Sequence, residues 1–150
     1  MLDVKMLRFP CAFPSNAPCD SSDTVSRSIV VEGMKDILFE IRRIFYIFGE
    51  GNIGLVRGKH ANGKSEFVLF NISGKSKVID EDLGETVYEL NEPRDAVYLP
   101  CMIWKEMYDF TLDSVLMVVT NEYYDAMEYV RDFEMFAEEV REMKRMLEMN

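Results

Sequence analysis

The residues with the clearest chemical potential lie in the stretch Arg57-Gly58-Lys59-His60-Ala61-Asn62, which contains the only histidine of the chain. If this stretch is a β-strand, its side chains alternate between two faces, so His60 and Asn62 point the same way. An imidazole takes up and releases a proton near neutral pH, whereas an amide only exchanges hydrogen bonds. The pattern therefore predicts a pocket in which one titratable base lies beside a neutral amide.

Basic residues gather around this stretch in a chain that is otherwise acidic. The 17 Lys and Arg against 27 Asp and Glu give a formal net charge of -10, which disfavours nucleic acid and anionic membranes as partners. The local basic region consists of Arg42, Arg43, Arg57, Lys59 and Lys64. We therefore expect a small anionic ligand, with no nucleic acid and no membrane as partner.

The composition suits a single globular domain, since 48% of the 150 residues are hydrophobic. Cys11, Cys19 and Cys101 form no C-x-x-C motif, and no apolar run is long enough to span a bilayer, which indicates a reduced, cytoplasmic protein. A secreted protein with one disulfide is the alternative. Charged residues interrupt any apolar core within residues 1–10, so we expect no signal peptide and no export.

Three segments of different character follow one another along the chain. Residues 1–22 are irregular and contain three prolines, and we expect a loose arm or an extension along an edge of the domain. Residues 23–124 contain short runs rich in β-branched and aromatic residues, which predict an antiparallel sandwich or barrel. These runs are 29–32, 39–48, 65–72, 76–79, 86–90, 96–99 and 114–120. Residues 125–150 have apolar residues at helical spacing, so we expect an amphipathic helix packed on the domain rather than on a membrane or a partner.

Four segments occur in the order and with the spacing of one protein family. They are 43–48 (RIFYIF), 57–61 (RGKHA), 104–110 (WKEMYDF) and 123–133 (YYDAMEYVRDF). Together they resemble the sugar-nucleotide 3,4-ketoisomerases, which are small bacterial cupins and usually homodimers. The resemblance covers residues 23–136 and implies an all-β cupin, a double-stranded β-helix or jelly-roll sandwich, with a C-terminal α-helix. It also implies a dTDP-4-keto-6-deoxyglucose substrate and a place in deoxysugar synthesis for surface polysaccharide.

The reaction of that family moves a ketone from C4 to C3 of the hexose through an enediol. It requires a base that removes the C3 proton and returns a proton at C4, and the resemblance implies neither a metal nor a cofactor. His60 is the expected acid and base, a role worth about 10²- to 10⁴-fold in rate. Tyr46 and Arg57 are expected to stabilise the enolate, and Arg43 and Arg57 to bind the diphosphate.

Further substrate contacts are expected from residues next to these motifs. They are Lys59, Trp104, Lys105 and Glu106. Trp104 has an equal alternative as a core residue, and we expect Tyr129 to pack where the sheet meets the helix.

Three features depart from the family pattern. Asn62 stands where the family has a second histidine, the residue usually assigned as its base, and an amide has no basic pKa in the working range. Asn62 is therefore expected to orient the sugar. Phe67 stands where relatives commonly have Gln, and Val25-Ser26 where they have Arg-Gly. These changes predict an altered substrate, weakened catalysis or none.

Three functions follow as hypotheses. The first is a metal-independent 3,4-ketoisomerase acting on a dTDP-4-keto-6-deoxyhexose. The second, prompted by Asn62, is a catalytically impaired cupin that binds a sugar nucleotide or assists another enzyme. The third is a metal-dependent cupin oxygenase or epimerase, for which His60 and Glu66 make a poor ligand set because no second nitrogen ligand is present. The expected partners are a nucleotide-diphospho sugar and a second copy of the chain in a homodimer.

Overall fold

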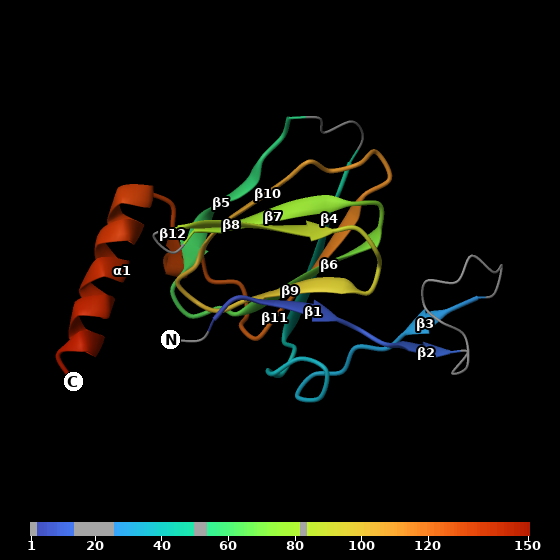
Figure 1. Cartoon of the computed structure of the whole chain (residues 1–150), viewed down its shortest axis with the longest axis horizontal. Helices are drawn as coiled ribbons and strands as arrows, with labels where there is room; N and C mark the ends of the chain where they lie inside the picture. The colour runs from blue at the N-terminus through green and yellow to red at the C-terminus, as the bar shows by residue number, and fades with distance from the viewer. Residues whose placement is uncertain (1–2, 14–25, 50–53, 82–83) are drawn as a thin grey trace.

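The computed structural model describes residues 3–13, 26–49, 54–81 and 84–150, and its main body consists of two facing antiparallel sheets (Figure 1). The first sheet has the strand order β1-β9-β6-β11-β4, and the second has the order β12-β5-β10-β7-β8. The strands of the first are β1 (Lys5–Arg8), β4 (Arg43–Phe48), β6 (Phe67–Ser73), β9 (Asp95–Leu99) and β11 (Val115–Thr120). Those of the second are β5 (Arg57–Asn62), β7 (Ser76–Glu81), β8 (Glu85–Leu90), β10 (Trp104–Tyr108) and β12 (Tyr129–Val130). The expected jelly-roll sandwich is confirmed.

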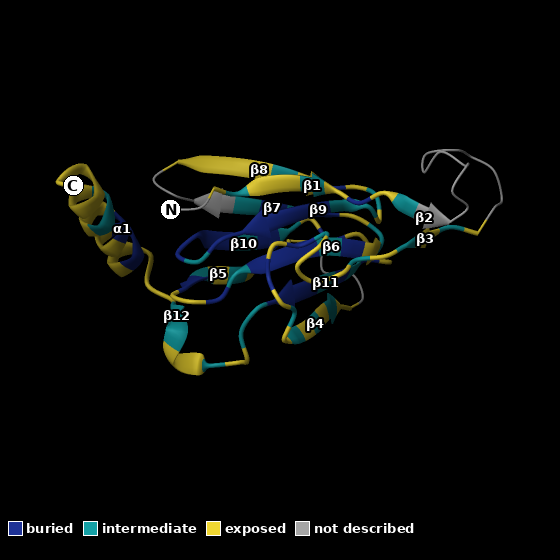
Figure 2. Cartoon of the chain, turned by 90° about the horizontal axis from the view of Figure 1, so that it is seen from below, coloured by how far each residue is buried: buried dark blue, intermediate teal, exposed yellow. Residues whose placement is uncertain are grey.

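The main core lies between the two sheets, because alternate residues of each strand point inward. Its buried side chains include Leu69, Val97, Leu99, Leu116 and Val118 from the first sheet and Val78, Leu90 and Met107 from the second. Strands in the middle of both sheets are accordingly the most buried part of the chain (Figure 2).

A second core covers the outer face of the first sheet. The segment before β4 contributes Ile37 and Phe39, which contact buried residues of β6, β9 and β11 such as Val68. Alternate residues on the outer face of the edge strand β4 are not covered by this second core. Ile44, Tyr46 and Phe48 are 55%, 58% and 65% exposed, so the outer face of β4 presents an apolar row to its surroundings.

The C-terminal helix α1 (Phe133–Glu148) lies at one end of the sandwich (Figure 1). Phe136 and Val140 on its inner side contact Trp104 and Ala61 on the outer face of the second sheet, while its other side is exposed (Figure 2). The Asp132 side chain accepts a hydrogen bond from a backbone N–H of the first turn and fixes where the helix begins. The helix starts later than residue 125 because residues 126–130 form the short 3-10 helix η1 (Ala126–Glu128) and strand β12.

The start of the chain is more regular than the sequence indicates. Residues 5–8 form β1, which pairs with β9 at the edge of the first sheet, and β2 (Cys11–Phe13) pairs with β3 (Ser28–Ile29). The backbone hydrogen-bonding groups of β1 are satisfied by pairing with the edge of the sheet, so β1 does not need the alternating pattern by which a strand is recognised in a sequence.

Cys11 is disulfide-bonded, contrary to the expectation of reduced cysteines, whereas Cys101 is a free thiol. In the described part of the chain, no helix is long and apolar enough to cross a membrane.

Candidate active site

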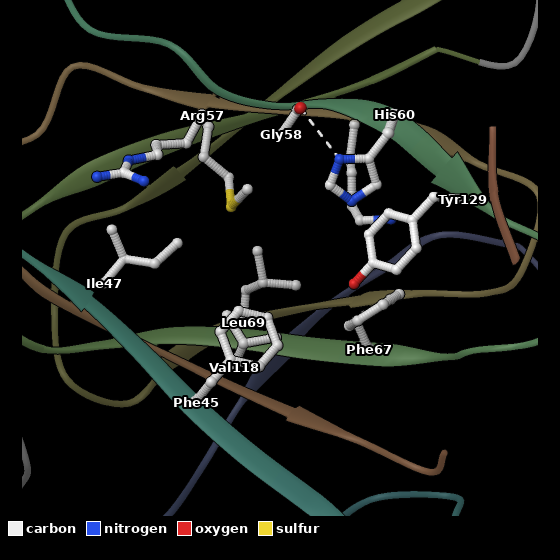
Figure 3. Close-up of a pocket in the computed structure, with 11 residues that line it drawn as sticks. Phe45, Ile47, Arg57, Gly58, His60, Phe67, Leu69, Val118 and Tyr129 are labelled. Carbon is white, nitrogen blue, oxygen red and sulfur yellow. Dashed lines mark hydrogen bonds between the residues drawn. The ribbon is translucent and has the colours of Figure 1, made fainter. Parts of the chain in front are cut away.

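A cavity of about 290 Å³ lies between the sheets where β5 and β10 face β4, β6 and β11 (Figure 3). Its apolar lining consists of Phe45, Ile47, Phe67, Leu69, Met107 and Val118. Its polar side chains are Arg57, His60, Lys105 and Tyr129. A largely apolar cavity with a few converging polar groups is the usual form of a small-molecule site.

A β-bulge shapes the strand that contains His60. Gly58 and Lys59 have φ angles of 89° and 57°, and the pairing of β5 with β10 shifts register at this point. A Cβ atom on Gly58 would lie 2.7 Å from the backbone oxygen of Lys105, so only glycine fits this close approach. The bulge therefore sets the direction in which the following His60 side chain points.

The His60 imidazole has one nitrogen held and one free. Its Nδ1 lies 3.0 Å from the Gly58 carbonyl oxygen, and because that oxygen only accepts, Nδ1 is the protonated nitrogen of the neutral ring. The Tyr129 ring packs against the imidazole with centroids 4.8 Å apart, at the end of the cavity away from Arg57 (Figure 3). Nε2 is thereby left with a lone pair for a proton from a ligand.

The surroundings of His60 favour the neutral imidazole. Burial lowers its pKa from 6.5 to about 4, and the nearby positive charge of Lys105 acts in the same direction. The ring is therefore unprotonated at neutral pH, which is the form that a general base requires.

We expect proton NMR to show the His60 ring titrating at about pH 4 rather than near 6.5. The signal is unambiguous because the chain has one histidine. The unfolded chain binds this proton near pH 6.5, so stability contributed by the neutral ring is present above that pH and is lost as the pH falls from about 6.5 to about 4. A midpoint near 6.5 in the folded protein would contradict the burial of the ring.

Lys105 enters the cavity from β10 and is buried. Lys105 is 4% exposed, and its Nζ lies 4.3 Å from the centroid of the Phe67 ring. The same Nζ donates a hydrogen bond to the Asn62 Oδ1 over 2.6 Å. The expected contact between Lys105 and a ligand thus has a geometric basis, because Lys105 lines the cavity.

Asn62 does not line this cavity. It is 1% exposed and lies behind Lys105, with its amide nitrogen donating to Glu128 over 2.7 Å. The structure therefore places the His60 side chain at the cavity wall and the Asn62 side chain outside the residues that line the cavity.

Three residues expected at the site lie on the opposite faces of their strands. Tyr46 is on the exposed outer face of β4, where its ring stacks on Phe48 with centroids 5.8 Å apart. Trp104 packs against the helix α1, with its ring centroid 5.7 Å from that of Phe136, and is a core residue. Glu106 is two residues after Trp104 and therefore on the same face of β10, and it is likewise absent from the cavity lining. The structure does not bring these three residues to the pocket, because adjacent residues of a strand cannot face the same side.

The expected cationic residues are separated by the structure. Arg57 is exposed and lines the cavity at the end opposite His60 (Figure 3). Arg43 shares the inner face of β4 with Phe45, but its guanidinium lies over the rings of Phe45 and Tyr124, at 5.6 and 5.7 Å, outside the lining. Lys59 is exposed at the bulge and also lies outside the lining. Arg57 is therefore the expected anion-binding residue that the structure places at the cavity.

Two residues of the site have roles that the sequence did not indicate. Tyr129 was expected to pack between sheet and helix, yet it lines the cavity because β12 pairs with the end of β5. Glu128, one residue earlier, receives hydrogen bonds from both Asn62 and Ser65. In the sequence, the only indication that Tyr129 and Glu128 belong to the site was their place in the fourth family segment, 123–133. Of the other departures, Phe67 forms part of the cavity wall, while Val25 lies outside the described residues.

The described residues contain no cluster of three or more His, Cys, Asp or Glu side chains that could hold a metal ion. His60 and Glu66 do not share such a cluster. Glu66 instead accepts hydrogen bonds from the Tyr98 hydroxyl and the Asn121 amide, the latter at 2.9 Å.

The two facing antiparallel sheets and the cavity between them define a cupin-type jelly roll. The family model FdtA, described as WxcM-like, C-terminal, matches residues 3–141, and the chain belongs to this family. The chain is 37% identical over 119 residues to the TDP-4-oxo-6-deoxy-alpha-D-glucose-3,4-oxoisomerase of Aneurinibacillus thermoaerophilus, covering 76% of this chain and 82% of that protein.

Solved structures give the same result. The 3,4-ketoisomerase QdtA from Thermoanaerobacterium thermosaccharolyticum, a double mutant in complex with TDP, has a TM-score of 0.83 and 29% identity, with 95% of this chain and 97% of that chain covered. A histidine-to-asparagine mutant of QdtA in complex with TDP-4-keto-6-deoxyglucose has a TM-score of 0.81 and 29% identity, with 95% and 96% covered. Both of these QdtA structures are thus of a 3,4-ketoisomerase, one with TDP bound and the other with TDP-4-keto-6-deoxyglucose.

Proposed function

We propose that this chain is a 3,4-ketoisomerase that acts on a TDP-4-keto-6-deoxyhexose. The observation that carries the proposal is the neutral His60 imidazole, whose free Nε2 faces the cavity between the sheets in a chain of this family. The cavity of about 290 Å³ is at the small end of ligand sites and suits a hexose, so the nucleotide would extend beyond it.

His60 is proposed as the group that moves the carbon-bound proton. Its Nε2 takes the proton from C3 as a double bond forms between C3 and C4, and later returns a proton to C4. The apolar wall of Phe45, Phe67 and Leu69 keeps water away from the enediol, which strengthens every polar contact inside the cavity.

Arg57 is proposed to bind the diphosphate at the mouth of the cavity. It lies at the end opposite His60, so a sugar with C3 near His60 would place its anomeric phosphate toward Arg57. No carboxylate of the described residues forms an ion pair with Arg57, whose guanidinium is therefore available to phosphate oxygens.

A second candidate function is a binding module without turnover, and the observation that favours it is Asn62 in the place of the family's second histidine. The structure weakens this alternative because Asn62 is 1% exposed and does not line the cavity. The QdtA histidine-to-asparagine mutant was obtained with TDP-4-keto-6-deoxyglucose bound, so in that protein this one histidine-to-asparagine replacement is compatible with binding.

One experiment separates the two functions. We expect that the purified protein, incubated with TDP-4-keto-6-deoxyglucose in D₂O, exchanges the C3 proton and forms the 3-keto isomer, followed by proton NMR of the sugar. Exchange requires only the base, whereas the isomer requires the full reaction. Thermal stabilisation by TDP without exchange or isomer would instead indicate the binding module.

The proposal includes a homodimer in the cytoplasm. The exposed row of Ile44, Tyr46 and Phe48 on the edge strand β4 is an apolar surface that a second copy of the chain could cover. A doubly charged sugar nucleotide does not cross a lipid bilayer unaided, so the protein is expected in the compartment where the nucleotide is made. Sedimentation of the purified protein at several concentrations measures the first point, and cell fractionation the second.

A further inference from the structure

Three polar side chains, the buried Lys105 and Asn62 and the half-buried Glu128, form a row of hydrogen bonds beside the cavity. Nζ of Lys105 donates to Oδ1 of Asn62 over 2.6 Å, and Nδ2 of Asn62 donates to Oε1 of Glu128 over 2.7 Å. The Ser65 hydroxyl donates to the same carboxylate oxygen. Because an ammonium only donates and a carboxylate only accepts, the two ends of the row fix the orientation of the amide between them.

The result of this row is a lysine amine held at the cavity wall next to the base. Lys105 is 4% exposed and lines the cavity together with His60, and its Nζ lies over the Phe67 ring. In the described part of the chain no carboxylate forms an ion pair with it, and Glu128 is separated from it by the Asn62 amide. The other titratable or charged groups that face it are His60 on β5, Tyr129 on β12 and, across the cavity, Arg57.

The proposed reaction includes a proton transfer between hydroxyl oxygens that His60 alone does not perform. When the ketone moves from C4 to C3, O4 gains a proton and O3 loses one, while His60 is occupied with the proton on carbon. We propose that Lys105 is the second proton-transfer group and moves the hydroxyl proton between O4 and O3. This inference rests on the proposed isomerase function.

The two groups together complete the reaction with every proton accounted for. In the first half, His60 takes the proton from C3, the C3–C4 double bond forms, and the Lys105 ammonium protonates O4 to give the neutral enediol. In the second half, the Lys105 amine takes the proton from O3, the C3 carbonyl forms, and the His60 imidazolium protonates C4. Both side chains return to their starting forms, and no other reactant is needed.

The protonation behaviour of Lys105 suits this task. Burial lowers its pKa from 10.5 to about 7, so the ammonium and the amine are both populated at neutral pH. A group that first donates and then accepts requires both forms. Asn62 and Glu128 act as positioning residues, because the neutral amide holds the ammonium without the direct ion pair that would keep it permanently charged.

The test is chemical rescue of Lys105→Ala, assayed with TDP-4-keto-6-deoxyglucose. We expect isomer formation to fall about 100-fold, and TDP affinity, measured by calorimetry, to change little. Ethylamine should restore part of the rate, whereas tetramethylammonium, which has the same charge but no transferable proton, should not. Lys35→Met, which removes an exposed lysine that does not line the cavity, is the matched control and should behave as the wild type.

A second variant covers the case in which the alanine protein does not fold. Lys105→Met fills the same space with an apolar chain, and it should show the same loss of isomer formation together with a His60 pKa that rises from about 4. Wild-type rates in either variant, or equal rescue by tetramethylammonium, would overturn the role of Lys105 alone. A wild type without exchange at C3 would overturn the isomerase itself, and this role with it.

Discussion

Replacing His60 with Gln should lower the rate of isomer formation by about 10²- to 10⁴-fold, the range found when a general acid and base is removed. The glutamine amide fills similar space but cannot take the C3 proton. Exchange of the C3 proton with D₂O should fall by the same factor, because it depends on the same step. TDP affinity should be retained, since Arg57 and the apolar walls of the cavity are unchanged.

The control for this prediction is the double variant His60→Gln with Asn62→His. Position 62 lies behind Lys105 and outside the cavity lining, so an imidazole there should not restore exchange at C3. Recovery of activity in the double variant would show that position 62 reaches the sugar, as the resemblance to the family first implied.

Gly58→Ala should lower the free energy of unfolding by about 2–4 kcal/mol, the sum of two costs. The first is the φ angle of 89°, which disfavours any residue with a Cβ atom. The second is contact, because the new Cβ would lie 2.7 Å from the Lys105 carbonyl oxygen. Urea denaturation measures the change in stability.

Alanine substitutions at two other glycines distinguish the backbone cost from the contact cost. Gly54 also has a positive φ of 82° but nothing within 4 Å of the added Cβ, so Gly54→Ala should cost only the backbone term, about 1–2 kcal/mol. Gly84 has neither feature, and Gly84→Ala should be close to neutral. Equal losses at Gly58 and Gly54 would mean that β10 can move away from β5 without cost. The bulge would then have no rigid role in directing His60.

The sandwich was predictable because several of its strands are runs rich in β-branched and aromatic residues. The runs at 65–72 and 96–99 correspond to β6 and β9, where burial selects such residues, and the run at 86–90 corresponds to the edge strand β8. Strands whose pairing depends on a distant neighbour were not predictable in this way. β12 is two residues long and becomes a strand only because the end of β5 is beside it.

The location of His60 in a pocket could be predicted, but the faces of its neighbours could not. In β4 the residues on both faces are largely apolar, so the sequence does not show that Phe45 and Ile47 point inward and Tyr46 outward. In β10 the side facing the cavity contains Lys105, which an alternation rule would assign to solvent. A buried charge is recognised only when its partners, here Asn62 and Glu128, are placed in space.

The contact between α1 and the second sheet gives the molecule a built-in optical reporter. Trp104 is the single tryptophan of the chain, and its indole lies between β10 and the rings of Phe133 and Phe136. Its sequence neighbour Lys105 projects from the other face of the same strand into the cavity. Emission from this one indole therefore reports on the contact between the helix and the second sheet.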